Sequence, residues 1–311
     1  MESDLEHQPV LLEEAINALN IKADGVYVDA TFGRGGHSKA ILDCLNDSGR
    51  ILAFDQDPQA VAYGRQHFNK DKRIEVVHCN FRQVANMVAE RGLDKKIDGV
   101  LMDLGVSSPQ LDDAARGFSF TRSGPLDMRM NTEEGESAMQ WLSRVSLNDL
   151  TYVLRKYGEE KSARRIATAI IESRNDTEIT DTRQLAEIIV NAVPGYEKHK
   201  HPATRSFQAI RIYLNEELQA LEEGLHAAVS VLAVAGRLVV ISFHSLEDRI
   251  VKRFMRNITN PPALPAGLPV MSTDNVVPYR LVGKSCVPSA EEIKRNPRAR
   301  SARLRVLERV L

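Results

Sequence analysis

The first hundred residues alternate short apolar runs with stretches whose apolar residues recur every three or four positions. Short runs rich in Val, Ile and Phe are typical of buried strands, and the longer period is typical of helices. The runs predict strands at residues 26–32, 51–54, 74–77 and 97–104. Asp57 and Pro58 predict a helix start directly after the second strand. Repeated strand–helix units predict a parallel sheet with right-handed crossovers.

This pattern stops after Ser108 and returns near the C-terminus. Residues 110–205 contain no good strand, and their period predicts helices at 139–145, 147–156, 163–172 and 182–191. Further on, the sequence predicts a long helix at about 206–233, a strand at 237–243, a helix at 246–255 and a strand at 303–307. Residues 257–290 carry six of the 13 prolines and predict an irregular connection. We therefore expect an α/β domain in two parts, 1–109 and 206–311, interrupted by a helical domain at 110–205.

Composition narrows the class of protein. The 311 residues are 43% hydrophobic and 27% charged, which is typical of a globular protein. No apolar run approaches the roughly 18 residues of a membrane helix, and the start of the chain lacks a signal-peptide pattern. Cys44, Cys79 and Cys286 lie far apart without a CxxC pair, so we expect neither a disulfide scaffold nor a bound metal. These features predict a cytoplasmic protein with no membrane partner.

The net charge of −1 hides an uneven distribution along the chain. Residues 280–311 hold nine Lys and Arg against three Asp and Glu. Arg298 and Arg300 lie in this basic segment, and clustered guanidinium groups suit contact with phosphate. A solvated basic tail is the alternative interpretation.

In doubly wound sheets, ligands bind beyond the carboxyl ends of the strands. The first strand is followed by the glycine-rich segment 33–38, where backbone N–H groups at a helix start favour an anion. Ser38 stands where the dinucleotide pattern GxGxxG needs its last glycine, so a pyrophosphate ligand is disfavoured. Asp55 follows Gly33 by 22 residues, near the spacing at which an acidic residue binds a ribose. Together these features indicate an adenosine ligand without pyrophosphate, and S-adenosylmethionine fits.

The fourth predicted strand leads into Asp103 and then Ser108-Pro109-Gln110. Amino-group methyltransferases carry a polar-Pro-Pro-aromatic motif at this place, whose acceptors hold an exocyclic amine. Ser108 and Pro109 resemble half of that motif, but Gln110 replaces the second proline. An ordinary loop is the alternative.

Ser242, His244 and Ser245 could suggest a hydrolase, but no GxSxG elbow is present. We interpret this segment instead as a loop lining a target pocket, with Phe243 available to stack on a base. Arg205 could contact phosphate, although arginines on helix surfaces usually pair with acids such as Glu216.

Eight blocks of sequence, in order along the chain, resemble the signatures of the RsmH (MraW) family, the cytosine-N4 methyltransferases of small-subunit (16S) ribosomal RNA. The blocks are residues 7–12, 29–38, 103–111, 116–120, 124–130, 201–215, 242–249 and 296–301. The resemblance implies a Rossmann-like, class I S-adenosylmethionine-dependent methyltransferase sheet with an inserted helical domain for substrate recognition. It also implies 16S rRNA within the small subunit as the partner.

Site residues carried over from this resemblance fall into three groups. The implied cofactor contacts are Gly35, Gly36, His37, Asp55, Phe81, Asp103 and Gln110. Asp103, Ser108 and Pro109 are the expected catalytic residues, and Phe243, His244, Arg205, Arg298 and Arg300 are the expected substrate contacts. Two alternatives remain open: an RNA-binding assembly factor with a vestigial cofactor site, and a methyltransferase acting on DNA or a small molecule. A homodimer is one option for the oligomeric state, which the sequence does not decide.

Overall fold

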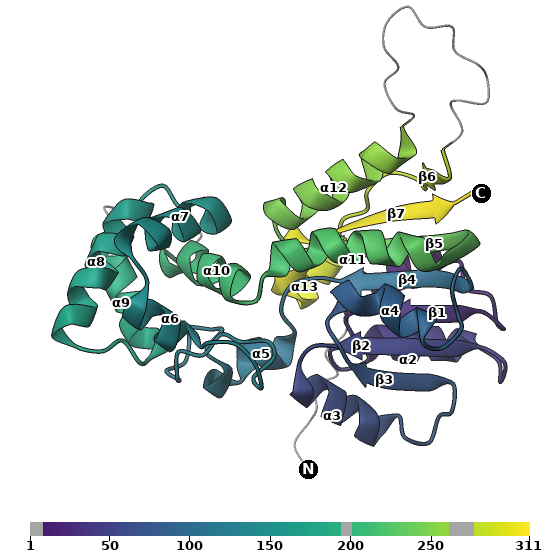
Figure 1. Ribbon diagram of the computed structural model, residues 1–311, viewed down its shortest axis with the longest axis horizontal. Helices are drawn as coiled ribbons and strands as arrows, with labels where there is room; N and C mark the ends of the chain where they lie inside the picture. Colours follow the sequence, from purple (N-terminus) through teal and green to yellow (C-terminus); the bar gives the residue numbers. More distant parts are fainter. Residues whose placement is uncertain (1–8, 194–200, 261–276) are drawn as a thin grey trace, which may run out of the picture. The chain divides into compact units, whose positions relative to one another are not determined.

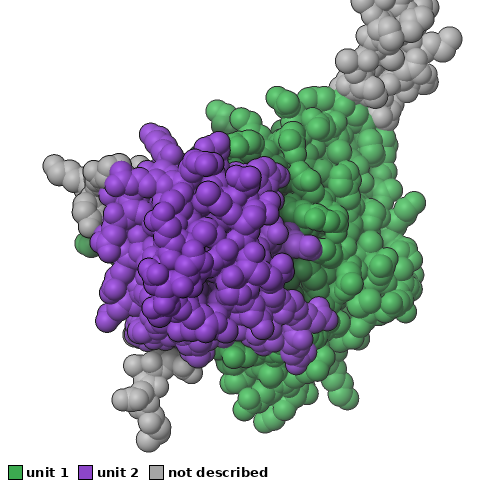
Figure 2. Space-filling view, turned by 60° about the vertical axis from the view of Figure 1, so that its left-hand side comes forward, with its two compact units in different colours: residues 1–105, 218–311 green, residues 106–217 purple. Residues whose placement is uncertain are grey.

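The computed structural model describes residues 9–193, 201–260 and 277–311. The chain divides into two compact units, which Figure 2 distinguishes by colour. The sheet unit comprises residues 1–105 and 218–311, and the helical unit comprises residues 106–217. The α/β sheet unit is therefore discontinuous in sequence, with the helical unit inserted into it.

Seven strands form the sheet, in the order β3-β2-β1-β4-β5-β7-β6. They are β1 (Val26–Asp29), β2 (Arg50–Asp55), β3 (Ile74–His78), β4 (Ile97–Asp103), β5 (Leu232–Ser242), β6 (Tyr279–Leu281) and β7 (Arg303–Arg309). The first five strands run parallel, whereas β7 pairs antiparallel with both β5 and β6. The Rossmann-like parallel sheet predicted from the sequence is confirmed, with an antiparallel edge added.

Both faces of the sheet are buried because neighbouring residues along each strand enter different cores. Tyr27 belongs to one core and Val28 to the other, and Leu101 and Met102 divide in the same way. The helices that cover these faces are α1 (Leu12–Leu19), α2 (Gly36–Cys44), α3 (Pro58–His67), α4 (Val84–Ala89), α11 (Glu217–Val231) and α12 (Ser245–Thr259) (Figure 1). Asp57 caps α3 with Pro58 at its first position, as the sequence predicted.

The helical unit has a core of its own. It contains α5 (Ser108–Asp112), α6 (Ala138–Arg144), α7 (Leu147–Gly158), α8 (Ala163–Asp176), α9 (Thr182–Ala192) and α10 (Ala203–Leu214). The core includes Trp141, Leu150, Ile166 and Leu185, and α10 adds the buried Phe207. Because α10 packs into this core, the compact unit extends beyond the predicted segment 110–205 and ends at Glu217.

Several predicted elements differ from the structure, and the strand expected at 237–243 already begins at Leu232. The single helix expected at 206–233 is broken into α10 and α11 at Glu216, whose φ of 49° is left-handed. Asn215 holds this break, since its side chain donates to the carbonyl of Met128 and accepts from the N–H of Met130. The strand expected at 26–32 ends at Asp29.

The predicted irregular segment 257–290 falls partly outside the described residues. Its described part begins with the end of α12 and later includes β6 and the start of α13 (Ala290–Arg295). No helix in the described part of the chain is long and apolar enough to cross a membrane.

Candidate functional site

Three neighbouring parallel strands each end in an aspartate at the same edge of the sheet: Asp29 on β1, Asp55 on β2 and Asp103 on β4. Asp29 is 1% exposed and accepts a hydrogen bond from the Ser38 hydroxyl at 2.6 Å. It also accepts from the backbone N–H of Thr31 at 3.2 Å. Burial raises the pKa of Asp29 to about 6. The sheet therefore gathers carboxylates where a ligand is expected.

A glycine loop joins β1 to α2 at this edge. Gly35 has a left-handed φ of 73°, and a Cβ there would lie 2.7 Å from the Phe32 ring. Only glycine fits this position without strain. Gly35 is the N-cap residue of α2 and gives that helix no side-chain cap, and Gly36 is the first helical residue. The first N–H groups of α2 are therefore suited to bind an anion.

Asp55 ties this loop to β2. Its two carboxylate oxygens accept from the N–H groups of Gly33, at 2.7 Å, and Asp57, at 2.8 Å. Burial raises the pKa of Asp55 to about 6, although these two hydrogen bonds favour its ionised form. Each oxygen keeps a second lone pair that can accept from a ribose hydroxyl.

Asp103 has a less satisfied environment. Its N–H donates to the Thr31 hydroxyl at 2.7 Å, which ties the end of β4 to β1. Its Oδ2 lies 3.7 Å from Nδ1 of His37, beyond hydrogen-bond distance. Among the described residues, neither Oδ1 of Asp103 nor Nε2 of His37 has a hydrogen-bond partner. These buried polar atoms are therefore available to bind a ligand.

The electrostatics of the cluster favour a positively charged ligand. Burial, Asp29 and Glu247 raise the pKa of Asp103 well above its usual range. Burial lowers the pKa of His37 to about 4, so this imidazole is neutral near pH 7 and supplies no countercharge. Within the described ranges, none of the three aspartates pairs with Lys or Arg. S-adenosylmethionine fits these carboxylates, because it carries an ammonium and a sulfonium group together with ribose hydroxyls.

The two predicted aromatic contacts lie at strand ends, and both pack into the protein. Phe81 opens the turn η1 (Phe81–Gln83) after β3, and its ring packs so closely on α11 that a Cβ at Gly224 would lie 2.5 Å away. Phe243 follows β5 and is half-buried against the core on one face of the sheet. Each ring is therefore at least partly structural.

His244 was predicted to line a target pocket, but it is the N-cap of α12. Its Nδ1 accepts from the N–H of Glu247 at 3.4 Å. In return, Oε2 of Glu247 accepts from the N–H groups of Phe243, at 2.8 Å, and His244, at 3.2 Å. This reciprocal capping box gives His244 a structural role at the helix start.

The predicted segment Ser108-Pro109-Gln110 opens α5 in the helical unit. Gln110 is buried, and its side-chain oxygen accepts from the N–H of Ser107 at 3.0 Å, which caps the helix. The carbonyl of Pro109 accepts from the N–H of Asp113 at 2.9 Å. Gln110 and Pro109 therefore both form hydrogen bonds that stabilise α5. Their roles in cofactor binding and catalysis remain predictions.

The predicted arginine contacts belong to other elements than the three aspartates. Arg205 is half-buried on α10 of the helical unit. On the same helix, Arg211 binds Glu217 through two hydrogen bonds of 2.8 Å. Arg298 and Arg300 are exposed in the turn η4 (Pro297–Ser301) of the sheet unit.

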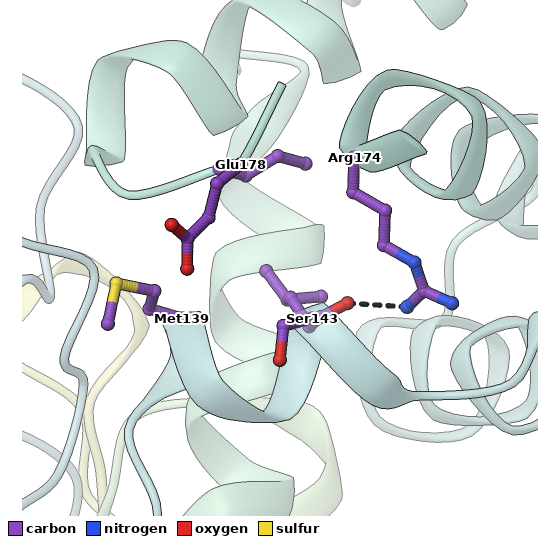
Figure 3. A pocket seen from close by; sticks show the side chains of 6 residues that line it. Met139, Ser143, Arg174 and Glu178 are labelled. Atoms are coloured by element: carbon purple, nitrogen blue, oxygen red, sulfur yellow. Dashed lines mark hydrogen bonds between the residues drawn. The ribbon is translucent and has the colours of Figure 1, made fainter. Parts of the chain in front are cut away.

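The helical unit also contains a hollow of about 230 Å³, shown in Figure 3. It is lined by Met139, Leu142, Ser143, Arg174, Glu178 and Ile179. Arg174 is directed toward the end of α6, where its guanidinium donates to the carbonyls of Leu142 and Val145. None of the predicted site residues lines this hollow. The hydrogen bonds of Arg174 there connect α8 to the end of α6.

Sequence reasoning omitted Asp29, Ser38, Thr31 and Glu247 from the site. Asp29 was hidden because the predicted strand ran on to residue 32, which placed this aspartate inside the strand rather than at its end. The signal that could have found it is the repetition of Asp at the ends of β1, β2 and β4.

Comparison with known proteins identifies the family of this chain. A profile of the MraW methylase family matches residues 4–310. A protein of Nitrosococcus oceani named ribosomal RNA small subunit methyltransferase H is 55% identical over 97% of this chain and 96% of its own length. A protein of the same name from Shewanella oneidensis is 52% identical over 100% of this chain and 99% of its own length. A solved rRNA methylase of Streptococcus thermophilus is 11% identical, with a TM-score of 0.43 and coverage of 96% and 94%. With the family profile spanning nearly every residue, the chain belongs to the MraW methylase family.

Proposed function

We propose that this chain transfers a methyl group from S-adenosylmethionine to the exocyclic N4 amine of a cytidine in 16S ribosomal RNA of the small subunit. The observation that carries the cofactor assignment is the cluster of three strand-end aspartates without a Lys or Arg partner among the described residues. The ribosomal substrate is supported by the names of relatives that are 52% and 55% identical. Such a substrate implies a cytoplasmic enzyme.

Each part of the cluster suits a different part of the cofactor. The N-terminus of α2 binds the cofactor carboxylate through backbone N–H groups. Asp55 accepts from the ribose hydroxyls, and Asp103 binds the ammonium group through its unpaired Oδ1. When bound, S-adenosylmethionine supplies an electrophilic methyl group on its sulfonium.

The target amine places other demands on the protein. The lone pair of a cytosine amino group is delocalised into the ring, so the enzyme must orient the amine and accept its N–H hydrogens. We assign this acceptor role to the Ser108 hydroxyl and the Pro109 carbonyl, because each oxygen can accept more than one hydrogen bond. Phe243 provides an aromatic ring on which the base stacks, and Arg205, Arg298 and Arg300 contact phosphates.

The direct test is to incubate the protein and labelled S-adenosylmethionine with small subunits from cells that lack it. We expect the label in N4-methylcytidine of 16S rRNA when the RNA is digested to nucleosides. Asp103→Asn should strongly reduce labelling, whereas Asp43→Asn should preserve it, because Asp43 is an exposed residue of α2. Label confined to another nucleoside would overturn the N4 assignment.

Two controls address the alternative functions. Calorimetric titration with S-adenosylmethionine distinguishes an enzyme from an assembly factor, since a vestigial site would show no binding heat. Faster methylation of DNA or free cytidine than of small subunits would favour a DNA or small-molecule methyltransferase instead.

A further inference from the structure

The helical unit displays three tyrosines and a lysine on one surface of α7 and α10. We call this set, Tyr152, Lys156, Tyr157 and Tyr213, the tyrosine surface. Tyr152 is 54% exposed and Tyr213 is 40% exposed. The ring centroid of Tyr157 lies 6.5 Å from that of Tyr152 and 6.3 Å from that of Tyr213. The three rings therefore form one continuous group.

Packing within the helical unit accounts for these rings only in part: Tyr157 packs against the core and Tyr213 against Trp141, whereas most of Tyr152 stays exposed. The core side of α7 is already filled by Leu150, Val153 and Leu154, each no more than 1% exposed. Nζ of Lys156 lies 5.0 Å from the ring centroid of Tyr152 and 5.2 Å from that of Tyr157. Aromatic faces flanked by a cation are suited to stack a planar group that carries negative charge nearby.

Four cationic residues lie close to Tyr152 and Tyr157 in the sequence. Arg155, Lys161, Arg164 and Arg165 are exposed, and none forms an ion pair with any residue that the structure describes. They lie on α7, on the turn that follows it and on the first turn of α8. This stretch holds three acids: Asp149 and Glu159 are exposed, whereas Glu160 is buried and accepts from the N–H of Ser162. The exposed charge is therefore mainly positive.

We propose that the tyrosine surface binds single-stranded RNA, with a nucleobase stacked on Tyr152 and the surrounding cations contacting the phosphates. This inference rests on the proposed function, because it assigns a second contact for the same RNA substrate. Single strands fit better than duplexes, since only unpaired bases offer their faces to an aromatic ring. The cations favour RNA over a ribosomal protein as the partner, because every nucleotide of an RNA strand carries a negatively charged phosphate.

The test uses the full-length protein and a labelled single-stranded RNA of about ten nucleotides, compared with a duplex of the same length. Tyr152→Ala should weaken binding of the single strand by about fivefold to a hundredfold, the loss expected for one stacked base. Tyr152→Phe should restore binding to within about twofold, since stacking needs the ring and not the hydroxyl. Leu281→Ala is the matched control, because Leu281 is 52% exposed but lies on β6 of the sheet unit.

Two further measurements bear on the same surface. Trp141 is the only tryptophan of the chain, and its ring centroid lies 4.9 Å from that of Tyr213. Binding of the RNA should therefore change the fluorescence emission of Trp141. Replacing Arg164 and Arg165 together by Gln should lower the slope of log affinity against log salt by about 0.7 for each phosphate that is no longer neutralised.

Binding of the single strand by Tyr152→Ala at the parental affinity would overturn this inference. So would a variant that binds the single strand normally but loses small subunits, because that result indicates a ribosomal protein as the occupant. The assay measures binding and not methyl transfer. A chain that binds this RNA through Tyr152 but methylates another nucleoside would overturn the proposed function alone.

Discussion

At the scale of single residues, Asp103 has the most direct consequences for function, because a buried carboxylate oxygen without a partner has no structural use. We predict that Asp103→Asn weakens binding of S-adenosylmethionine at least about tenfold, since a charge-assisted bond contributes roughly 1.5–3 kcal/mol. Isothermal titration calorimetry measures this loss directly. Asp43→Asn removes the same charge from an exposed site and should leave the dissociation constant unchanged. Equal affinities for the Asp103 variant and the parent would refute the assignment.

Protonation of the strand-end aspartates should also control cofactor affinity. The pKa values of Asp29 and Asp55 are raised to about 6, so both are largely protonated at pH 5 and ionised at pH 7. Because a cationic ligand needs the ionised forms, and the pKa of Asp103 is raised as well, we predict that affinity increases as pH rises from 5 to 8. Titrations at pH 5, 6, 7 and 8 test this, and Asp55→Asn should flatten the curve. An affinity that falls over this range would contradict the sign.

The sequence predicted Asp55 and Asp103 because each follows a recognisable apolar strand. It could not predict that Gln110 and His244 are used to cap helices, because these bonds depend on side-chain geometry at α5 and α12. Nor could it show that His37 is buried and neutral, since burial is a property of the packed fold. The ends of β2 and β4 are thus readable from the chain to within one residue, whereas the end of β1 and the partners of polar side chains are not.

At the scale of elements, β7 is anchored to α12 by ion pairs. Arg305 makes bonds of 2.7 and 3.1 Å to Asp248, and Nε of Arg303 lies 3.8 Å from the same carboxylate. We predict that Asp248→Ala lowers the free energy of unfolding by about 1–2 kcal/mol, as expected for a partly buried pair. Thermal unfolding should show a Tm lower by a few degrees.

Arg298 and Arg300 provide the matching comparison, because they are exposed in η4 and precede this anchor. Replacing both by Ala should lower the Tm less than Asp248→Ala does, weaken binding to small subunits and flatten its salt dependence. The affinity for S-adenosylmethionine should stay within about twofold. A lower Tm with an unchanged salt slope would show that these arginines stabilise the fold and do not contact RNA.

Most helices were predictable from their period because their apolar residues face one core. The break between α10 and α11 was not, since it is held by bonds from Asn215 to the distant residues Met128 and Met130. The strand β6 was also missed, because three residues carry too little pattern to be recognised. Local periodicity therefore predicts which helices and strands form, whereas hydrogen bonds to distant residues determine where they end.

At the scale of the whole molecule, the three aspartates and the glycine loop all belong to the sheet unit. We predict that replacing residues 106–217 by a short linker, in a product shown to be folded, preserves cofactor affinity and abolishes RNA methylation. Calorimetry and the nucleoside assay measure the two effects separately. Loss of cofactor binding in a folded product would instead show that a residue of the inserted unit, such as Gln110, is an essential cofactor contact.

The discontinuous sheet also has a consequence for synthesis on the ribosome. In the sheet, β4 lies between β1 and β5, but β5 begins at Leu232, after the whole helical unit has been made. Translation proceeds at roughly 5–20 residues per second. The β5-facing edge of β4 therefore stays unpaired for on the order of 10 s after β4 has been made. The helical unit, with its local contacts, has time to fold in that interval. A chain released before Leu232 exposes an unpaired central strand, and we expect such a product to be bound by chaperones or degraded.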